Sequence, residues 1–200
     1  TTTAPIWSRC SNSLLDEDDS LEITRFLRAV DVRIDGFRVE KAPEWRGQRV
    51  FVKHEVDGKG YELRLSEESA GTQKLMGLAS FLLAALERGG TVVVDELDAK
   101  LHPKLLRYVI LLFKDPEVNK SGAQLIFSSQ DVSTMRNDVF RRDEIWFAAR
   151  GEGEASQLWS LADIHEANGN LVSKNAAFDK QYLSGRYGAD PYLTRIEEWD

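Results

Sequence analysis

Two adjacent acids, Asp95 and Glu96, directly follow the apolar run Val92-Val93-Val94. A short β-branched run is typical of a buried strand, and the end of such a strand is where α/β proteins bind ligands. In a nucleotide-hydrolysing site the first carboxylate would hold Mg²⁺, and the second would polarise the water that attacks the γ-phosphate. Strands also end in acids that only begin a turn or cap a helix, so the pair alone favours a structural interpretation.

The segment Glu68-Ser69-Ala70-Gly71-Thr72-Gln73 could bind a phosphate group. It precedes a helical pattern, and small residues at a helix N-terminus expose backbone N–H groups toward an anion. The hydroxyl groups of Ser69 and Thr72 can also donate hydrogen bonds. An ordinary helix with Ser69 as its cap explains the same residues, and only agreement with other motifs favours the phosphate interpretation.

The elements around these residues alternate between helix and strand. Leucines at helical spacing predict a helix that stops at Gly89-Gly90; they are Leu75, Leu78, Leu82 and Leu86. A second helix is expected from Pro103 to about Asp115-Pro116, and a second buried strand over 124–128. This alternation predicts the strands of an α/β core.

The first third of the chain predicts a helix and an antiparallel sheet. Ser20 can cap the helix, whose apolar residues near one face are Leu21, Phe26, Leu27 and Val30. Extended segments are expected over 32–39, 49–55 and 61–65, with Asp57-Gly58 as a hairpin turn. Later strands are expected over 144–148 and 157–161, joined by a hairpin loop at Gly151-Glu152-Gly153.

Composition restricts the class of protein. The 200 residues are 42% hydrophobic, contain one cysteine (Cys10) and have a formal net charge of -7. The chain has no apolar run of the roughly 20 residues that a membrane helix needs. A lone cysteine is compatible with a reducing cytoplasm, the expected location. The net charge does not indicate a nucleic-acid partner, although a local basic stripe would still allow DNA binding.

Several ordered motifs resemble those of ABC-type ATPases. ESAGTQKL, VVVDELDAKLHP and QLIFSSQD resemble the signature motif, the Walker B motif with its D-loop, and the switch region. The chain is most similar to the OLD-like and abortive-infection ATPases of bacteria, whose signature is similar to ESxGT. RRDEIWFAAR and the tail YLSGRYGADPY also resemble that group, so the match extends from roughly Leu21 to the C-terminus.

The resemblance implies an α/β P-loop NTPase fold of the ABC type. The chain would form the C-terminal part of one such domain, with a signature helix, core parallel strands and a small antiparallel β subdomain. Residues 1–65 would form the first helix and the β subdomain, and 66–165 the signature helix with the Walker B and switch core. Residues 166–200 would be a tail, in which we expect Tyr182 and Tyr187 to pack against the domain or to contact a partner.

The resemblance also implies roles for individual residues. Asp95 would be the Walker B acid that holds Mg²⁺, and Glu96 the catalytic glutamate. Ser69, Gly71 and Thr72 would contact the γ-phosphate of ATP held mainly by a second ATPase head. Asp98 would lie in the D-loop that connects the two sites of the dimer; a turn or helix-cap role is equally compatible with its position. His102, next to Pro103, is expected to cap or pack.

One departure from the ABC pattern concerns the phosphate-binding loop. The chain has no GxxxxGK followed by Ser or Thr, so it lacks the principal cradle for the β- and γ-phosphates. Since the chain also starts at Thr1, we expect the P-loop and Q-loop to lie upstream in a longer gene product. The intact protein would be an ATPase, and this chain alone would bind ATP poorly and be inactive.

Three functions are compatible with these features. The first is an ATP-dependent molecular switch in bacterial phage defence, with a separate effector protein. The second is a DNA-repair or chromosome-maintenance ATPase like the RecF and SMC groups, in which Arg136, Arg141 and Arg142 could contact DNA. The third is a non-hydrolysing scaffold with an ABC fold, against which the retained Asp95 and Glu96 argue.

A second departure predicts slow hydrolysis. Gln130 occupies the switch position at which ABC ATPases usually have histidine, and an amide cannot become an imidazolium that stabilises developing charge. We expect Gln130→His to hydrolyse ATP faster than the unmodified intact protein in a steady-state phosphate-release assay. A variant that turns over no faster would contradict this role for Gln130.

Overall fold

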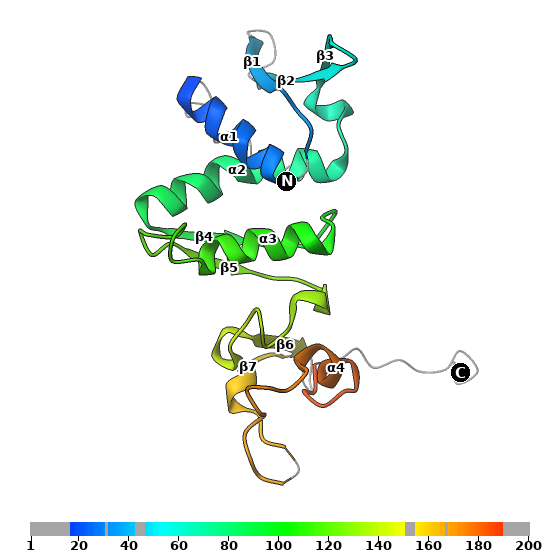
Figure 1. The fold of residues 1–200 in the computed structure, drawn as a ribbon. Helices are drawn as coiled ribbons and strands as arrows, with labels where there is room; N and C mark the ends of the chain where they lie inside the picture. Colours follow the sequence, from blue (N-terminus) through cyan, green and yellow to red (C-terminus); the bar gives the residue numbers. More distant parts are fainter. Residues whose placement is uncertain (1–16, 31, 43–46, 151–154, 167, 190–200) are drawn as a thin grey trace, which may run out of the picture. The chain divides into compact units, whose positions relative to one another are not determined.

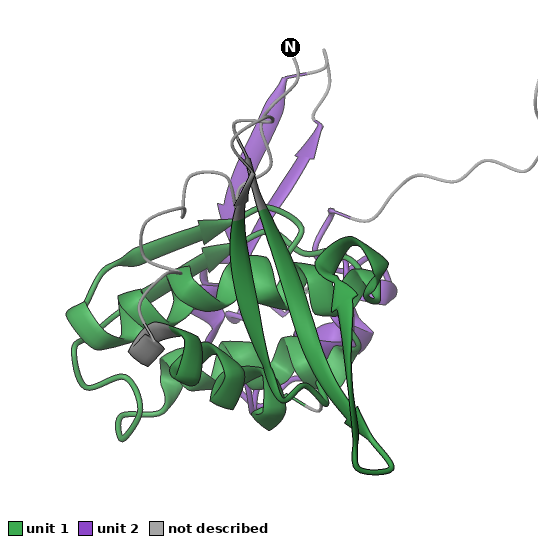
Figure 2. Ribbon diagram, turned by 90° about the horizontal axis from the view of Figure 1, so that it is seen from above, with its two compact units in different colours: residues 1–129 green, residues 130–200 purple. Residues whose placement is uncertain are grey.

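The computed structural model describes residues 17–30, 32–42, 47–150, 155–166 and 168–189 (Figure 1). The chain forms two compact units, Thr1–Ser129 and Gln130–Asp200, which Figure 2 colours separately. Over the described residues the fold is mixed α/β, with one parallel pair of strands and two antiparallel sheets. None of the described helices has both the length and the apolar composition to cross a membrane.

Unit 1 begins with a helix and an antiparallel sheet of strand order β1-β2-β3. The elements are α1 (Glu17–Ala29), β1 (Gly36–Ala42), β2 (Gly47–Val56) and β3 (Lys59–Arg64). The predicted turn between β2 and β3 is confirmed, because Asp57 and Gly58 both have positive φ angles, 51° and 73°. Two successive positive φ angles are typical of the type I′ turn, whose twist matches that of the flanking strands.

The start of α1 differs from the prediction. Ser20 does not cap the helix, which begins at Glu17, and the carbonyl of Ser20 instead accepts a hydrogen bond from Thr24 Oγ1 at 2.8 Å. Leu21 is 50% exposed, and Ile23 takes its place on the buried face together with Phe26. The first strand also begins at Gly36 rather than Val32.

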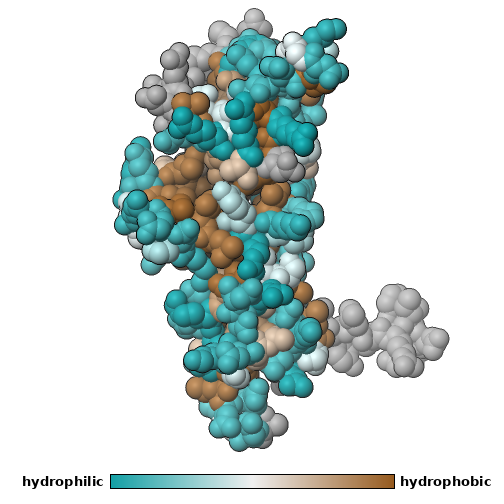
Figure 3. All heavy atoms as spheres, viewed as in Figure 1, coloured by the Kyte–Doolittle hydropathy of each residue, from teal (hydrophilic) through white to brown (hydrophobic). Residues whose placement is uncertain are grey.

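The rest of unit 1 alternates between helix and strand as expected. Its elements are α2 (Ala70–Arg88), β4 (Thr91–Val94), α3 (Pro103–Lys114) and β5 (Gln124–Phe127). The four predicted leucines of α2 are all buried. Gly89 ends α2 with a φ of 71°, and a Cβ atom there would lie 2.4 Å from the carbonyl oxygen of Ser121. Figure 3 shows apolar residues gathered at the level of α2 and α3, next to the largely hydrophilic β1-β2-β3 sheet.

Within the described residues, one face of the parallel pair β4-β5 is buried and the other is exposed. Val92 and Val94 alternate with Val93, whose side chain is 73% exposed, and Ile126 on β5 is 56% exposed. The prediction of two buried strands is therefore wrong for the face that holds Val93 and Ile126. The cause is the pleat of a strand, because successive side chains point to opposite faces and only one of them meets α2 and α3.

Unit 2 consists of an antiparallel hairpin and a short helix around an aromatic core. Its elements are β6 (Trp146–Arg150), β7 (Ser156–Ser160) and α4 (Phe178–Leu183). The predicted strands are confirmed with shifts of one or two residues, while the loop at 151–153 lies outside the described residues. Phe147 stacks on Tyr182 at 5.7 Å between ring centroids and contacts Tyr187 at 5.4 Å. Tyr187 is only 4% exposed, so the expected packing role of the tail tyrosines is confirmed.

The buried position of Leu82 in unit 1 predicts a large loss of stability when this side chain of α2 is shortened. Leu82 is 0% exposed, and Leu82→Ala should lower the free energy of unfolding by about 3 kcal/mol through lost burial and an unfilled cavity. Leu21→Ala removes the same atoms from a half-exposed site and should cost about 0.5 kcal/mol. Urea denaturation of both variants measures the difference, and equal losses would contradict the assigned core.

Candidate active site

The carboxyl ends of β4 and β5 meet at Asp95, Glu96 and Ser128. The parallel register pairs Val94 with Phe127, so the next residue of each strand, Asp95 and Ser128, lies at the same edge of the sheet. Ser128 Oγ donates a hydrogen bond to the Asp95 carboxylate and accepts one from the backbone N–H of Glu96 at 2.7 Å. One hydroxyl group thus orients both acidic residues.

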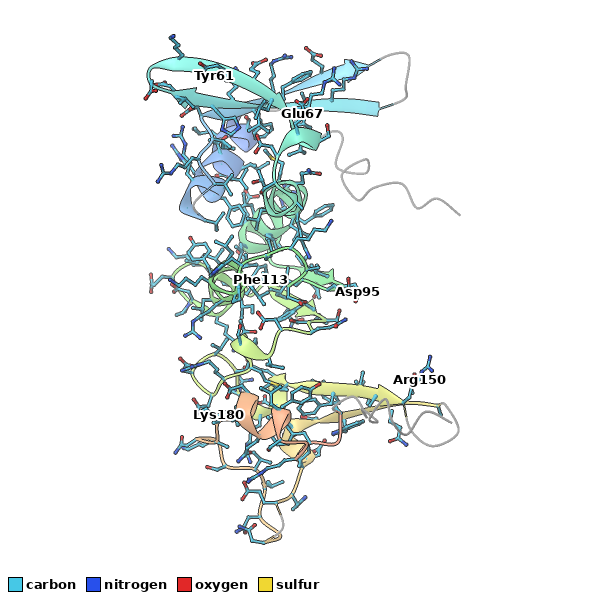
Figure 4. All side chains as sticks on the ribbon, turned by 90° about the vertical axis from the view of Figure 1, so that its right-hand side faces the viewer. Tyr61, Glu67, Asp95, Phe113, Arg150 and Lys180 are labelled. Atoms are coloured by element: carbon cyan, nitrogen blue, oxygen red, sulfur yellow. The ribbon has the colours of Figure 1, made fainter. Side chains whose placement is uncertain are left out.

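Asp95 and Glu96 are both solvent-exposed, and Figure 4 shows Asp95 at the end of β4. Glu96 has a φ of 49°, in the left-handed region that residues other than glycine rarely adopt. Among the described residues, no three His, Cys, Asp or Glu side chains gather in a way that could hold a metal ion. An exposed carboxylate next to a hydroxyl group nevertheless fits Mg²⁺, which prefers oxygen ligands and keeps several waters.

Ser69 caps α2, as the structural interpretation of this segment expects. Its Oγ accepts a hydrogen bond from the backbone N–H of Thr72 at 3.1 Å and lies 2.8 Å from the Thr72 hydroxyl. Ser69 is exposed, whereas Thr72 is 8% exposed. The exposed hydroxyl of Ser69 is therefore the side-chain group of this segment that a phosphate could reach without a change in the helix.

The start of α2 lies against the turn that follows β4. A Cβ atom on Gly71 would be 2.9 Å from the carbonyl oxygen of Lys100, a distance that only glycine accommodates without a shift. One turn further along α2, Lys74 Nζ donates a hydrogen bond to the carbonyl oxygen of Glu96. The structure thus brings together two segments that lie more than twenty residues apart in sequence.

Lys74 is a residue of this site that the sequence motifs did not identify. Burial lowers the pKa of its ammonium group, an effect that Asp98 and Glu96 oppose and Lys100 reinforces. In the sequence, Lys74 stands out only as the one charged residue of α2 before Glu87 and Arg88 at the helix end.

The remaining predicted residues occupy turns and caps. The backbone carbonyl of Asp98 accepts a hydrogen bond from Leu101 N at 2.9 Å, within the turn after β4. His102 caps α3, because its Nδ1 accepts a hydrogen bond from Lys104 N at 3.2 Å, and its expected structural role is confirmed. Gln130 is exposed and is the first residue of unit 2.

His54 of β2 contacts the segment before α2, which the sequence analysis did not anticipate. Its Nε2 lies 2.6 Å from Glu68 Oε1 and its Nδ1 lies 2.9 Å from the carbonyl oxygen of Arg33. Both partners are hydrogen-bond acceptors, so the charged imidazole, in which both ring nitrogens carry hydrogen, can donate to both of them. Burial opposes that charge, but the hydrogen bonds to Glu68 and Arg33 outweigh it and raise the pKa of His54.

These elements, a strand that ends in two acids beside a capped helix in a mixed α/β fold, are compatible with an AAA-type domain. Residues 11–136 match the family model described as "AAA domain, putative AbiEii toxin, Type IV TA system". The match covers more than half of the 200 residues, and the chain belongs to this AAA-domain family.

Two further comparisons accompany the family match. The chain is similar to a solved structure described as "Structural biochemistry of ATP-driven dimerization and DNA stimulated activation of SMC ATPases", with 16% sequence identity and a TM-score of 0.43. That similarity covers 69% of this chain and 88% of the other. A comparison with curated proteins gives no match.

The His54–Glu68 pair predicts a pH-dependent stability. Because the folded-state pKa of His54 is raised above 6.5, its stabilising contribution is complete below pH 6.5 and is lost as pH rises through the folded-state value. The free energy of unfolding of His54→Gln, measured in urea, should therefore fall below that of the unmodified protein most strongly at acidic pH. A gap between the two proteins that stays constant from pH 5.5 to pH 9 would contradict a charged His54.

Proposed function

We propose that this chain supplies the Walker B and signature side of an ATP-hydrolysing site. The observation that supports the proposal best is the joint orientation of Asp95 and Glu96 by Ser128 at the carboxyl end of a parallel pair. A structural turn needs only one such acid, whereas phosphoryl transfer to water uses a metal-binding carboxylate and a second acid near the attacking water.

In the proposed mechanism Asp95 would hold Mg²⁺ with its exposed carboxylate, which Ser128 orients. The chemistry that Mg²⁺ would supply is neutralisation of the charge that develops on the phosphate oxygens. Glu96 would accept a hydrogen bond from the attacking water, align it with the γ-phosphate and take up the proton that the water loses. Gln130 would hydrogen-bond the γ-phosphate or the same water from the switch position.

The start of α2 would contact ATP held mainly by a second ATPase head. Ser69 would donate its hydroxyl to the γ-phosphate, and the backbone near Gly71 would add an N–H group and the helix dipole. The Thr72 hydroxyl would act through Ser69, because the two hydroxyl groups are hydrogen-bonded to each other. Asp98, in the turn after β4, would link the two sites of the paired heads.

The proposal requires a P-loop, which the 200 residues do not contain. We propose that another segment of the parent gene product supplies it, and that this chain alone binds ATP weakly. The parent protein is therefore the appropriate material for activity measurements.

For the cellular role we propose a switch in bacterial phage defence of the OLD-like or abortive-infection type. The family description, which names an AbiEii toxin and a Type IV TA system, supports a defence setting. In the alternative DNA-repair role, of RecF or SMC type, three arginines could contribute to DNA binding, and each of them has a partner within unit 2. Arg136 pairs with Asp138 at 2.9 Å and Arg141 with Asp143 at 2.8 Å, and Arg142 donates to the carbonyl of Val172.

Replacing the proposed catalytic acid tests the ATPase function. In the parent protein Glu96→Gln should lower the rate of ATP hydrolysis at least ~100-fold, because an amide cannot accept a proton from the attacking water. ATP binding, measured by fluorescence of a labelled nucleotide, should change little. Asp163→Asn, an exposed acid in unit 2, is the matched control and should hydrolyse ATP normally. If the folded parent protein and Glu96→Gln are equally inert, the scaffold function is correct instead.

A further inference from the structure

Glu96 is held in an unfavourable backbone conformation by contacts on both sides of the residue. Its φ of 49° places a side chain close to its own backbone, so the conformation persists only where surrounding groups maintain it. The N–H of Glu96 donates to Ser128 Oγ at 2.7 Å, and the carbonyl accepts from Ala99 N at 3.0 Å and from Lys74 Nζ. Ala99 belongs to the same turn, whereas Ser128 and Lys74 come from other elements, the end of β5 and the second turn of α2.

Lys74 is an unusual choice for a position that needs packing alone. Lys74 is half-buried near the start of α2, and burial of its ammonium group lowers its pKa, an effect that Asp98 and Glu96 oppose. Partial burial of a charged group costs free energy unless a partner compensates, and an aliphatic residue would fill the same space without this cost. The ammonium group is therefore better explained by what it binds, the carbonyl of Glu96, than by packing.

Gly71 makes a second contact between the same two segments. A Cβ atom on Gly71 would lie 2.9 Å from the carbonyl oxygen of Lys100, so only glycine lets α2 approach the turn after β4 this closely. Gly71 and Lys74 are one helical turn apart on α2. Gly71 lies against Lys100, at the end of the loop after β4, and Lys74 bonds Glu96, at its start. A displacement of the first turns of α2 would thus move Glu96.

We infer that Lys74 is a positioning residue for Glu96, which holds its backbone so that the carboxylate faces the reacting phosphate and couples its placement to the start of α2. This inference rests on the proposed function, because it assigns Glu96 to the hydrolysis step. Lys74 itself does not touch the reacting atoms; it acts through the backbone carbonyl of Glu96.

The kinetic test compares three variants of the parent protein. Lys74→Met keeps the length of the side chain but removes the ammonium group, and should lower kcat for ATP ~10-fold with KM within about threefold, since misplaced catalytic groups slow the chemical step. Lys74→Arg retains the charge and a donor and should recover most of the activity. Lys120→Met, an exposed lysine between α3 and β5, is the control for loss of one charge and should equal the unmodified protein.

Amide hydrogen exchange tests the same contact without ATP hydrolysis. In Lys74→Met the amides of residues 96–101 should exchange ~10-fold faster than in the unmodified protein and in Lys74→Arg, while those of α3 stay unchanged. Lys74→Gln, which is polar and uncharged, provides a second variant if Lys74→Met melts at a much lower temperature. Unchanged exchange in both variants, or an unchanged kcat in Lys74→Met, would overturn the inference.

The two measurements separate the inference from the proposed function. If the parent protein does not hydrolyse ATP, the proposed function fails and the role of Lys74 in catalysis fails with it. The exchange measurement then still decides whether Lys74 holds the turn after β4. If the parent protein is active and Lys74→Met is fully active, only the positioning role is refuted.

Discussion

The candidate site depends on the parallel pairing of β4 with β5. Because Val94 pairs with Phe127, the chain leaves both strands at the same edge, and Ser128 is close enough to bond Asp95 and Glu96. A shift of one residue in this register would place the Ser128 hydroxyl on the opposite face of the sheet. The register is maintained by inward-facing apolar residues such as Val94, which is buried beneath the helices of unit 1.

Helix α2 connects this edge with the antiparallel sheet of unit 1. Its first turns contact the turn after β4 through Gly71 and Lys74. The residue two positions before the helix, Glu68, forms an ion pair with His54 on β2. Movements of the antiparallel sheet and of the turn after β4 would therefore both act on the same short segment, 68–74.

Periodicity and local chemistry predicted most helices and strands. These signals are local in sequence, so they can be read without knowing the tertiary structure. Examples are the leucine spacing of α2, the glycine that ends it and the turn at Asp57-Gly58. The start of α1 was predicted incorrectly because Ser20 has the chemistry of a cap yet lies inside the helix. The burial of β4 was predicted only in part, since a β-branched run shows that a strand forms and not which of its faces is covered.

The sequence by itself determined the motif order, the α/β class and the position of Asp95 and Glu96 after a strand. These follow from residue types and spacing over short distances, where hydrophobic periodicity and turn chemistry act. Only the tertiary structure decided that Ser128 orients both acids, that Lys74 bonds the carbonyl of Glu96 and that His54 meets Glu68. Each of these contacts joins residues at least fourteen positions apart, and the packing of whole elements is what makes such distant atoms neighbours.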